Sequence, residues 1–573
     1  MSDQRNLIVA LVLSVAILFA FQYFYEAPRM REAQQRAEAE RATATQTTQP
    51  PATAPGQAPS LGAASGPTAA LTREQALALT PRVRIDNGSV HGSISLKGGR
   101  FDDITLANYR ETVDPSSPEI VLLSPPGSPN PYFAEHGWVA GDASVAVPGP
   151  ETMWTAEGNR ISAGDGVTLR WDNGQGLSFA KRVTVDPDYM FTVARSVTNN
   201  SDRPVTLYPY GLISRWGTPH TEGYYILHEG PIGVFDGSLQ EYKYDDVAEE
   251  GQIQFDSTGG WMGITDKYWL ASLVPQQDLA FKAAFRHVAE GDRYQTDYRG
   301  PPMTVAPGAT VQVTDQLFAG AKVVTLLDRY AEQYRIPLFD RAVDFGWFYF
   351  LTKPIFYILH YIHQVVGNYG VAILILTLLV KLCFFPLADK SYRAMAQMKK
   401  LQPEMQKLRE LYGDDKVRMN QELMALYKKE KVNPLSGCLP IVIQIPVFFA
   451  LYKVLFVTIE MRHTPFFGWI RDLSAPDPTS VFNLFGLLPF TPPHILMIGV
   501  WPLIMGFTMW LQQRLNPQPA DPTQAKVMQF LPVMFTFLFA TFPAGLVIYW
   551  SWNNILSIAQ QWAIMKRMGV KAT

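Results

Sequence analysis

Long apolar runs gather at the two ends of the chain, and a long polar region lies between them. Five runs crowd the C-terminal part, at roughly 368–387, 437–460, 494–514, 525–541 and 543–565, and a sixth extends from Leu7 to Tyr25. Each is close to the ~20 residues that a helix needs to cross the hydrocarbon layer of a membrane. The pattern predicts a multi-span α-helical membrane protein with one N-terminal span and a five-helix core.

The N-terminal run is predicted to be an uncleaved transmembrane anchor, residues 1–27. The alternative is a cleaved signal peptide, but the run is longer than such peptides need and no small-x-small cleavage site follows it. Residues 28–74 are rich in Ala, Gln, Thr and Pro. Such a composition cannot bury enough apolar surface to fold, so we expect a disordered tether here.

Residues 75–325 alternate between apolar and polar side chains in many short segments. One is Val90–Leu96, and another runs through Phe191, Val193, Arg195 and Val197. Gly, Pro, Asn and Asp punctuate the segments. Alternation with a period of two over so many short strands predicts a large antiparallel β-sandwich.

Residues 326–366 are predicted to connect this β-domain to the membrane core. A short helical connector is followed by a stretch in which aromatic residues mix with Lys353, His360 and His363. That mixture is typical of an amphipathic helix lying in the membrane interface. No acidic residue stands near the two histidines, so we predict no metal site there. Residues 367–573 then form the five-span core.

Composition narrows the class of protein. Apolar residues reach 47%, and charged residues make up 17% where soluble proteins have roughly 25%. With 49 basic and 51 acidic residues, net charge does not point to nucleic acid. Cys383 and Cys438 are too few for a disulfide framework or a Cys-based zinc site, and no phosphate loop of the G-x-x-x-x-G-K-S/T type is present. We predict no cofactor, no metal and no enzymatic activity.

The distribution of positive charge orients the spans. The segment 388–431 holds 11 Lys or Arg against 7 Asp or Glu, whereas the connection 461–493 holds two of each. By the positive-inside rule the first segment faces the cytoplasm and the second faces the opposite side. Alternation then places both termini in the cytoplasm and the β-domain outside it.

The cytoplasmic segment 388–434 is predicted to form a helical hairpin. Apolar residues recur at spacings of three and four from Met395 to Leu411 and from Met419 to Leu426, which predicts one apolar stripe on each helix. The stripes can serve only to hold the helices together. Methionine, however, suits surfaces that accept varied apolar partners. We therefore predict a docking surface for clients at Met395, Met398, Met405, Leu408, Met419 and Leu423.

Lys381 stands inside a strongly apolar run, Val371–Leu382. An ammonium at the centre of a bilayer costs ~2.5–3.5 kcal/mol even on permissive scales, so it normally faces water or a partner. Thr377 lies four residues earlier, on the same helix face. No Asp or Glu lies deep in a span to pair with Lys381, which indicates a water-filled cavity. A lysine that snorkels toward the polar region near Asp389 fits the pattern as well.

Three motifs resemble the YidC/Oxa/Alb family of membrane protein insertases. The first is the basic residue followed by Pro386-Leu387, and the second is Asn433–Pro440 with Gln444-Ile445-Pro446. The third is Phe542–Leu546 with Tyr549, Trp550, Asn553 and Asn554. With the order of segments, the resemblance covers nearly the whole chain. It is strongest to the Gram-negative members, whose large periplasmic β-domain is similar in fold to sugar mutarotases.

The resemblance implies a chaperone and insertase of the bacterial inner membrane. In this family a hydrophilic groove receives the polar extracellular segment of a client, whose apolar helix then enters the bilayer. The partners implied are nascent membrane-protein clients, the Sec translocon, the ribosome or targeting machinery, and membrane lipids, with no sequence readout of nucleic acid. The groove residues implied here are Lys381, Thr377, Gln444, Tyr549, Trp550 and Asn553.

Two positions depart from the family pattern. The family usually has Arg where this chain has Lys381, so bidentate pairing with a carboxylate is lost. Trp550 replaces the more usual Tyr.

Two other functions fit parts of the sequence. A secondary transporter could use Lys381 to bind an anionic solute, but the five core spans show no internal repeat. The β-domain could act on sugars, but it shows no paired carboxylates beside a base, and similarity of fold does not carry activity.

Overall fold

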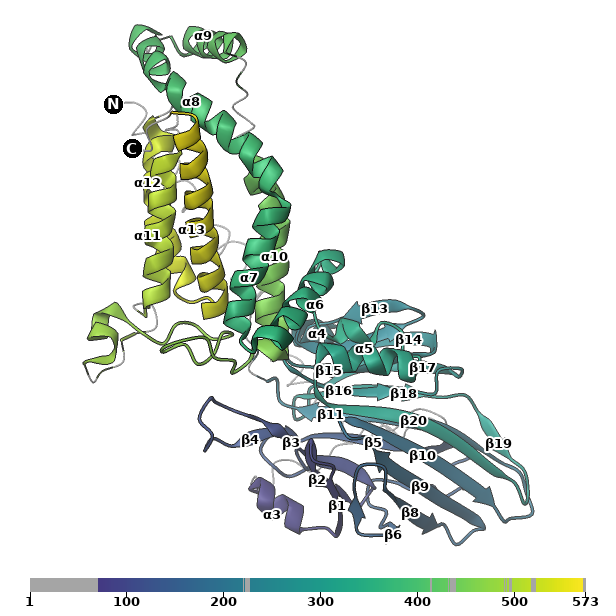
Figure 1. The fold of residues 1–573 in the computed structure, drawn as a ribbon. Coiled ribbons are helices and arrows are strands. Elements are labelled where there is room, and N and C mark those ends of the chain that lie inside the picture. Colours follow the sequence, from purple (N-terminus) through teal and green to yellow (C-terminus); the bar gives the residue numbers. More distant parts are fainter. Residues whose placement is uncertain are drawn as a thin grey trace, which may run out of the picture. The chain divides into compact units, whose positions relative to one another are not determined.

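The described part of the chain begins with a β-rich region and ends in a set of helices (Figure 1). A computed structural model describes residues 71–569 apart from 220, 222–226, 413–414, 431, 433–438, 489, 491, 494–496 and 517–521. The predicted anchor at 1–27 and the predicted tether up to residue 70 lie outside the described residues, as does the motif residue Asn433.

The tether was expected to continue to residue 74, but ordered structure begins earlier. Helix α3 (Arg73–Ala78) starts from Thr72, whose side chain accepts the Gln75 backbone N–H while the Gln75 side chain accepts that of Thr72. This reciprocal capping box satisfies two backbone donors that a helix start leaves free. Sequence composition missed it because only a few residues carry the signal.

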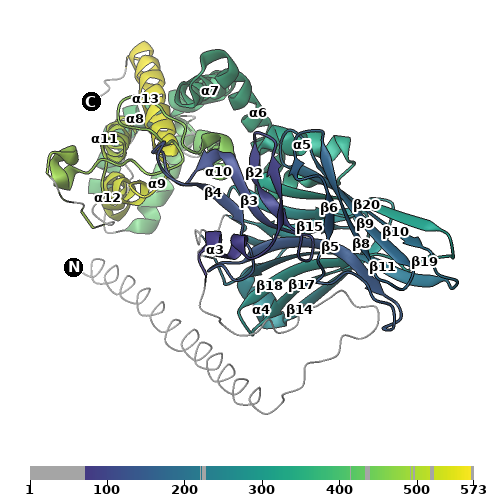
Figure 2. The same cartoon turned by 90° about the horizontal axis from the view of Figure 1, so that it is seen from below.

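Two large sheets form the β-rich region, seen from a second side in Figure 2. The first has eleven strands, with this order along its main path: β14 (Gln252–Thr258), β17 (Ala280–Val288), β18 (Arg293–Arg299), β11 (Val205–Trp216), β5 (Tyr132–Ala140), β3 (Arg100–Arg110), β2 (Val90–Ser95), β1 (Arg82–Asp86) and β7 (Arg160–Ile161). Strand β19 (Met303–Val305) pairs with β11, and β4 (Glu119–Leu123) pairs with β3.

The second sheet has nine strands in this order: β13 (Ser238–Glu241), β12 (Gly230–Phe235), β15 (Gly260–Thr265), β16 (Trp269–Val274), β20 (Thr310–Ala321), β10 (Met190–Asn199), β9 (Leu177–Val185), β8 (Gly166–Asp172) and β6 (Thr155–Glu157). Among the named strands of the described region, every pair is antiparallel except β1 with β7. A large antiparallel sandwich was predicted, and the parallel pair is a small departure from it.

Strand β10 shows how the alternating pattern becomes the core. Phe191, Val193 and Val197 are fully buried, and so is Arg195 on the same face. The Arg195 guanidinium donates to the carbonyl oxygens of Gly137 and Tyr210 at 2.6 and 2.5 Å, and it pairs with Asp315. A buried charge is tolerated only when it is paired and hydrogen-bonded in this way. The guanidinium therefore joins the two sheets.

The connector is packed into the β-rich region. Helix α5 (Val324–Gln333) buries Tyr330, and the 3₁₀ helix η2 (Phe339–Ala342) buries Phe339. The Phe339 ring meets Trp261 and Phe318 edge-on, at centroid distances of 5.3 and 5.5 Å. The sequence placed this connector with the interfacial helix, but its apolar contacts are with the sheets.

The remaining helices, apart from α4, belong to the C-terminal half. They are α4 (Tyr244–Glu250, between strands), α6 (Tyr349–Val366), α7 (Tyr369–Cys383), α8 (Phe385–Tyr412), α9 (Lys416–Lys429), α10 (Leu439–Val457), η4 (Ile459–Met461), η5 (Val481–Gly486), α11 (Val500–Leu515), α12 (Pro522–Phe539) and α13 (Ala544–Arg567).

Within the described ranges, no unbroken helix combines the length and hydropathy of a membrane span; α7 and α8 do so only as a pair bent by 70°. The predicted number of spans stays a prediction.

Helix α13 lies against α11 and α7, and polar side chains reinforce both contacts. The Asn554 amide donates to Thr508 of α11 at 3.2 Å, and the Trp552 indole donates to the Leu374 carbonyl of α7 at 3.2 Å. A tight hairpin of the last two helices was expected, with α13 against α12. The chain does reverse over residues 540–543, but α13 packs more closely on α11 than on α12.

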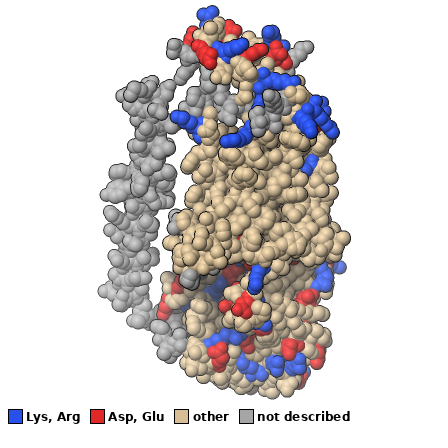
Figure 3. Space-filling model, turned by 60° about the vertical axis from the view of Figure 1, so that its left-hand side comes forward, with Lys and Arg blue, Asp and Glu red and all other residues tan. Residues whose placement is uncertain are grey.

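The outer surface of the helical region is apolar. Figure 3 shows one face on which uncharged residues form a broad belt, with charged residues of both signs above and below it. Exposed side chains of this region include Phe507 on α11 and Phe530 on α12, which are 61% and 63% exposed. Apolar patches of this extent mark surfaces that contact lipid or protein.

Candidate functional site

Lys381 lies in the last turn of α7, just before the chain bends into α8. Its ammonium donates to the Ser557 hydroxyl of α13 at 2.7 Å. The bend follows Phe384, two residues before Pro386, where a single straight span was expected to continue. Because α8 turns away by 70°, Lys381 lines a pocket between the helices instead of lying in one straight span.

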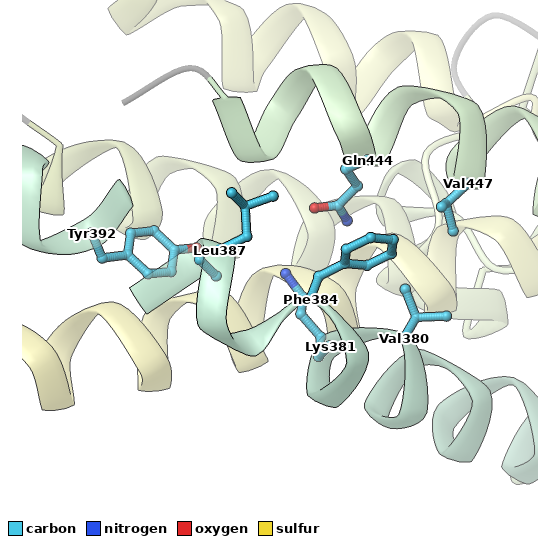
Figure 4. Close-up of a pocket in the computed structure, with 8 residues that line it drawn as sticks. Val380, Lys381, Phe384, Leu387, Tyr392, Gln444 and Val447 are labelled. Carbon is cyan, nitrogen blue, oxygen red and sulfur yellow. The ribbon is translucent and has the colours of Figure 1, made fainter. Parts of the chain in front are cut away.

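The pocket has a cavity volume of about 40 Å³ and is lined from three helices. Figure 4 shows Lys381 of α7 and Gln444 of α10 pointing toward one another, with Tyr392 of α8 at one side. The other lining residues are apolar: Val380, Phe384, Leu387, Ala388 and Val447. The cavity thus combines one cation and a few polar groups with apolar walls.

A chain of polar side chains supports the pocket from α13. The Gln444 amide donates to the Asn553 side-chain oxygen at 2.6 Å. The Tyr549 hydroxyl, on a side chain only 2% exposed, forms a hydrogen bond with Gln444. Three of the predicted residues therefore form one hydrogen-bonded group beside Lys381.

Of the six predicted groove residues, Lys381 and Gln444 line the pocket, Asn553 and Tyr549 reach it only through Gln444, and two lie elsewhere. Thr377 is 1% exposed, and its hydroxyl donates to the Ile373 carbonyl of its own helix at 2.6 Å. Trp550 packs among rings of α10 and α12, with its centroid 4.6 Å from Phe448 and 5.1 Å from Phe539. Neither lines the pocket. A threonine can turn its hydroxyl back to the carbonyl four residues earlier, which sequence spacing does not reveal.

Sequence reasoning overlooked Ser557 and Tyr392. Ser557 follows Asn553 by four residues and Tyr549 by eight, so the three lie on one face of α13. That spacing could have indicated it. Tyr392 belongs to the segment assigned to the hairpin, and only the bend after Phe384 brings it beside the pocket.

The charge of Lys381 is not neutralised by the side chains around it. Among the residues that the structure describes, its hydrogen-bond partner is a hydroxyl, and no carboxylate lies within ion-pair distance. An ammonium in a partly apolar pocket favours an anionic group arriving from outside.

The predicted hairpin surface is partly accessible. Met395, Met398 and Met405 on α8 are half-buried, as are Leu408 and Met419, while Leu423 of α9 is buried. The Tyr427 hydroxyl reaches the Met405 sulfur at 3.7 Å. Leu411 was placed in the stripe but is 71% exposed in the last turn of α8. The stripes hold the helices together and leave the methionine side chains reachable.

The histidines of α6 have aromatic neighbours. The His363 ring stacks on Tyr369 at a centroid distance of 3.6 Å, and the His360 ring stacks on Phe356 at 5.8 Å. Over the described ranges no group of three His, Cys, Asp or Glu side chains converges as a metal site would require.

Two family matches cover the chain, and the boundary between them falls within α6. The family described as the YidC periplasmic domain matches residues 82–358, and the family described as 60Kd inner membrane protein matches residues 361–571. These matches, with the sheets and the apolar helices, define an inner-membrane protein that carries a periplasmic domain.

Whole-chain relatives agree. The membrane protein insertase YidC of Methylobacterium nodulans is 55% identical over 584 residues, covering 100% of this chain and 96% of its own. That of Rhizobium meliloti is 52% identical over 577 residues, covering 100% and 97%. The chain belongs to the YidC family. The family is named for insertion of membrane proteins, a transport function that is not enzymatic.

Two solved structures align with large parts of the chain. One, titled as an active YidC insertase with its first transmembrane domain resolved, covers 84% of this chain and 92% of its own at 18% identity and a TM-score of 0.35. A putative aldose 1-epimerase from Escherichia coli K12 covers 42% and 99% at 10% identity and a TM-score of 0.28. Scores this low carry no argument, so similarity of the β-domain to mutarotases stays a prediction.

Proposed function

We propose that this chain inserts client proteins into the bacterial inner membrane by receiving their polar segments in the Lys381 pocket. The observation that carries the proposal is an ammonium without a carboxylate partner among the described residues, at an open pocket between α7, α8 and α10. A polar or acidic client segment would replace the missing counter-charge there. Gln444 would supply further hydrogen bonds, Asn553 and Tyr549 would hold its side chain in place, and Thr377 and Trp550 would support the helices behind them.

The client's apolar helix would leave the pocket along α7 and α13. Outward-facing side chains on these helices are exposed, including Leu379 and Leu382 on α7 and Ile555 on α13. Such a surface offers a new apolar helix contacts as favourable as those with lipid tails. The pocket and this surface together would let the polar and apolar parts of a client separate.

The proposed orientation follows the distribution of charge. The α8–α9 hairpin would face the cytoplasm, with both termini, and the β-domain would face the periplasm. The hairpin would receive clients from the ribosome or targeting machinery, and the surrounding lipid and the Sec translocon would be partners of the helical region.

Photo-crosslinking tests the proposal directly. A crosslinking amino acid at Phe384, which lines the pocket, should capture a stalled nascent membrane protein. The same amino acid at Phe507, exposed on α11 and not among the lining residues, is the matched control. Capture at Phe384 but not at Phe507 supports the pocket as the entry site. Equal capture at both positions, or none at Phe384, overturns it.

A further inference from the structure

The connection between η4 and α11 carries an exposed apolar loop. Its residues are Val481, Phe482, Leu484, Phe485, Leu487, Leu488 and Phe490, here named the η5 loop, and they are between 37% and 82% exposed. In Figure 1 this loop, in light green, extends sideways from the lower end of α11. From Pro478 to Gln513 the sequence has no Asp, Glu, Lys or Arg. So large an exposed apolar surface is costly in water.

Several backbone groups of the loop are paired within the loop, and the Val481 N–H donates to the Ile498 carbonyl at 3.1 Å. The Phe485 N–H donates to the Ser480 carbonyl at 2.7 Å, and the Leu488 N–H donates to the Asn483 carbonyl at 3.0 Å. The Asn483 amide in turn donates to the Phe490 carbonyl at 3.3 Å. Irregular backbone can enter an apolar medium only when its polar groups are paired internally. The η5 loop meets this condition over the groups named.

Two successive residues of the loop adopt the left-handed conformation. Leu484 has φ 50° and ψ 47°, and Phe485 has φ 58° and ψ 35°. This region is unfavourable for bulky side chains and persists where the surroundings enforce it. Both side chains are about half exposed. A strained conformation that directs apolar side chains outward is expected where their exposure is useful.

A buried carboxylate fixes the base of the loop to α11. Asp477 is 3% exposed and accepts the Trp469 indole N–H at 3.1 Å and the Trp501 backbone N–H at 2.9 Å. The exposed apolar face of α11, which includes Phe507, begins directly beyond this point. The loop therefore continues a surface that the proposed function places against lipid.

We propose that the η5 loop inserts into the outer leaflet of the bilayer as a shallow apolar wedge beside α11. Its occupant is lipid and not a second protein, because the loop lacks charged groups, pairs several of its own backbone groups and is continuous with the lipid-facing side of α11. Trp469, whose indole is bonded to Asp477 at the base of the loop, is a residue type that suits the membrane interface beside such a wedge. The inference rests on α11 standing in a membrane.

Depth-dependent quenching tests the wedge. The full chain, with Cys383→Ser and Cys438→Ser, is reconstituted in vesicles of phosphatidylethanolamine and phosphatidylglycerol with an environment-sensitive fluorophore on Leu487→Cys. The same label on Leu79→Cys in α3 and on Phe507→Cys in α11 gives an aqueous and a bilayer reference; Leu79 is 69% exposed. Phe482→Cys is a second loop position should the first variant fail to fold.

The expected result is a blue-shifted label in the loop. Its fluorescence should be quenched more by lipids that carry the doxyl group near the headgroup than by lipids that carry it deep in the acyl chain. Quenching by iodide should be severalfold weaker than for the label on Leu79→Cys. Loop labels that behave like the Leu79 label overturn the proposal. So does a blue shift without lipid quenching that grows with the protein-to-lipid ratio, since that indicates contact between copies. If the Phe507 label also escapes lipid quenching, the bilayer placement of α11 fails together with the wedge.

Discussion

Lys381 could be recognised from sequence because a cation inside an apolar run is costly. Its surroundings could not. Thr377, four residues earlier, was expected beside it but turns its hydroxyl to its own helix, whereas Ser557, far away in sequence, provides the hydrogen bond. Periodicity predicts which residues share a helix face, and it says nothing of which helix lies opposite. The resemblance named Gln444, Asn553 and Tyr549 as groove residues but not the hydrogen bonds that join them.

The charge of Lys381 is expected to decide how well acidic clients insert. Two unit charges about 4 Å apart attract by roughly 4 kcal/mol at an effective dielectric near 20. Lys381→Ala should lower insertion of a client with an acidic outer tail by about tenfold, which corresponds to ~1.4 kcal/mol of that attraction. Lys381→Glu should be more defective and Lys381→Arg tolerated. Protease protection measures the insertion of two matched clients, one with an acidic and one with a neutral outer tail, by each variant.

Ser557→Ala is the control for position, since it removes the hydrogen bond and keeps the charge. It should affect acidic and neutral tails alike and only slightly. If the Ala and Glu variants of Lys381 insert both tails equally, the lysine is only snorkelling and takes no part in capture.

Lys181 in the β-domain should make stability depend on pH. It is 1% exposed, and burial lowers the pKa of its ammonium from 10.5 to about 7, an effect that Glu135 partly opposes. Between those values the unfolded chain binds a proton that the folded one does not, so stability rises with pH by at most ~1.4 kcal/mol per unit. Below about pH 7 both states are protonated and the slope vanishes.

Hydrogen exchange of the full chain measures this effect. Opening free energies for peptides from β8 to β10 should increase from pH 7 to pH 9 after correction for intrinsic exchange. Lys181→Met should flatten the increase, and Lys282→Met on β17, where the lysine is 67% exposed, should not. An unchanged slope in Lys181→Met would assign the effect to other groups.

At the scale of elements, apolar residues that repeat every two positions indicated strands in the right regions. Apolar runs and repeats of three to four positions likewise indicated the helices. The alternation at 191–197 became β10, and the apolar runs became α7, α10, α11, α12 and α13. The ends of the helices and the bends between them were less predictable from the sequence. The bend between α7 and α8 occurs at Phe384 and not at Pro386, because a proline fits the first turn of a helix and can begin α8. The contacts of the connector with Trp261 are long-range and leave no local pattern.

The α8–α9 hairpin is expected to be the element that receives clients. Removing residues 395–430 should abolish client handover while the helices around Lys381 remain folded, because the hairpin projects beyond them (Figure 1). Site-specific crosslinking of a nascent client to Phe384, scored against total protein in the membrane, measures handover. Leu411→Ser is the matched control, since this residue is 71% exposed at the helix end. Normal crosslinking without the hairpin would reduce it to a spacer.

At the scale of the molecule, ion pairs fasten the connector to the helices. Lys353 of α6 lies 2.8 Å from both Asp328 of α5 and Asp340 of η2. Lys453 of α10 lies 2.9 Å from Asp344. All five side chains are between 10% and 23% exposed. Partly buried pairs of this kind are costly to break from one side, because the partner stays behind without its counter-charge. The connector is thereby held by the sheets on one side and by α6 and α10 on the other.

This double attachment predicts that loosening the connector harms insertion more than removing most of the β-domain. Deleting residues 80–300 takes away every named strand except β19 and β20 but spares the ion pairs, so insertion should fall without being lost. Lys353→Ala with Lys453→Ala keeps the sheets and removes the lysine partners of Asp328, Asp340 and Asp344. It should lower insertion by about tenfold, equivalent to ~1.4 kcal/mol. The two variants are compared by the insertion of one client in cells depleted of the native protein. Insertion is normalised to the amount of folded variant in the membrane, and Lys282→Met is the control.

Complete loss of insertion in the deletion while its helices still assemble would show that the sheets themselves handle clients. Normal insertion by the double variant would show that the ion pairs do not position the helices that form the Lys381 pocket.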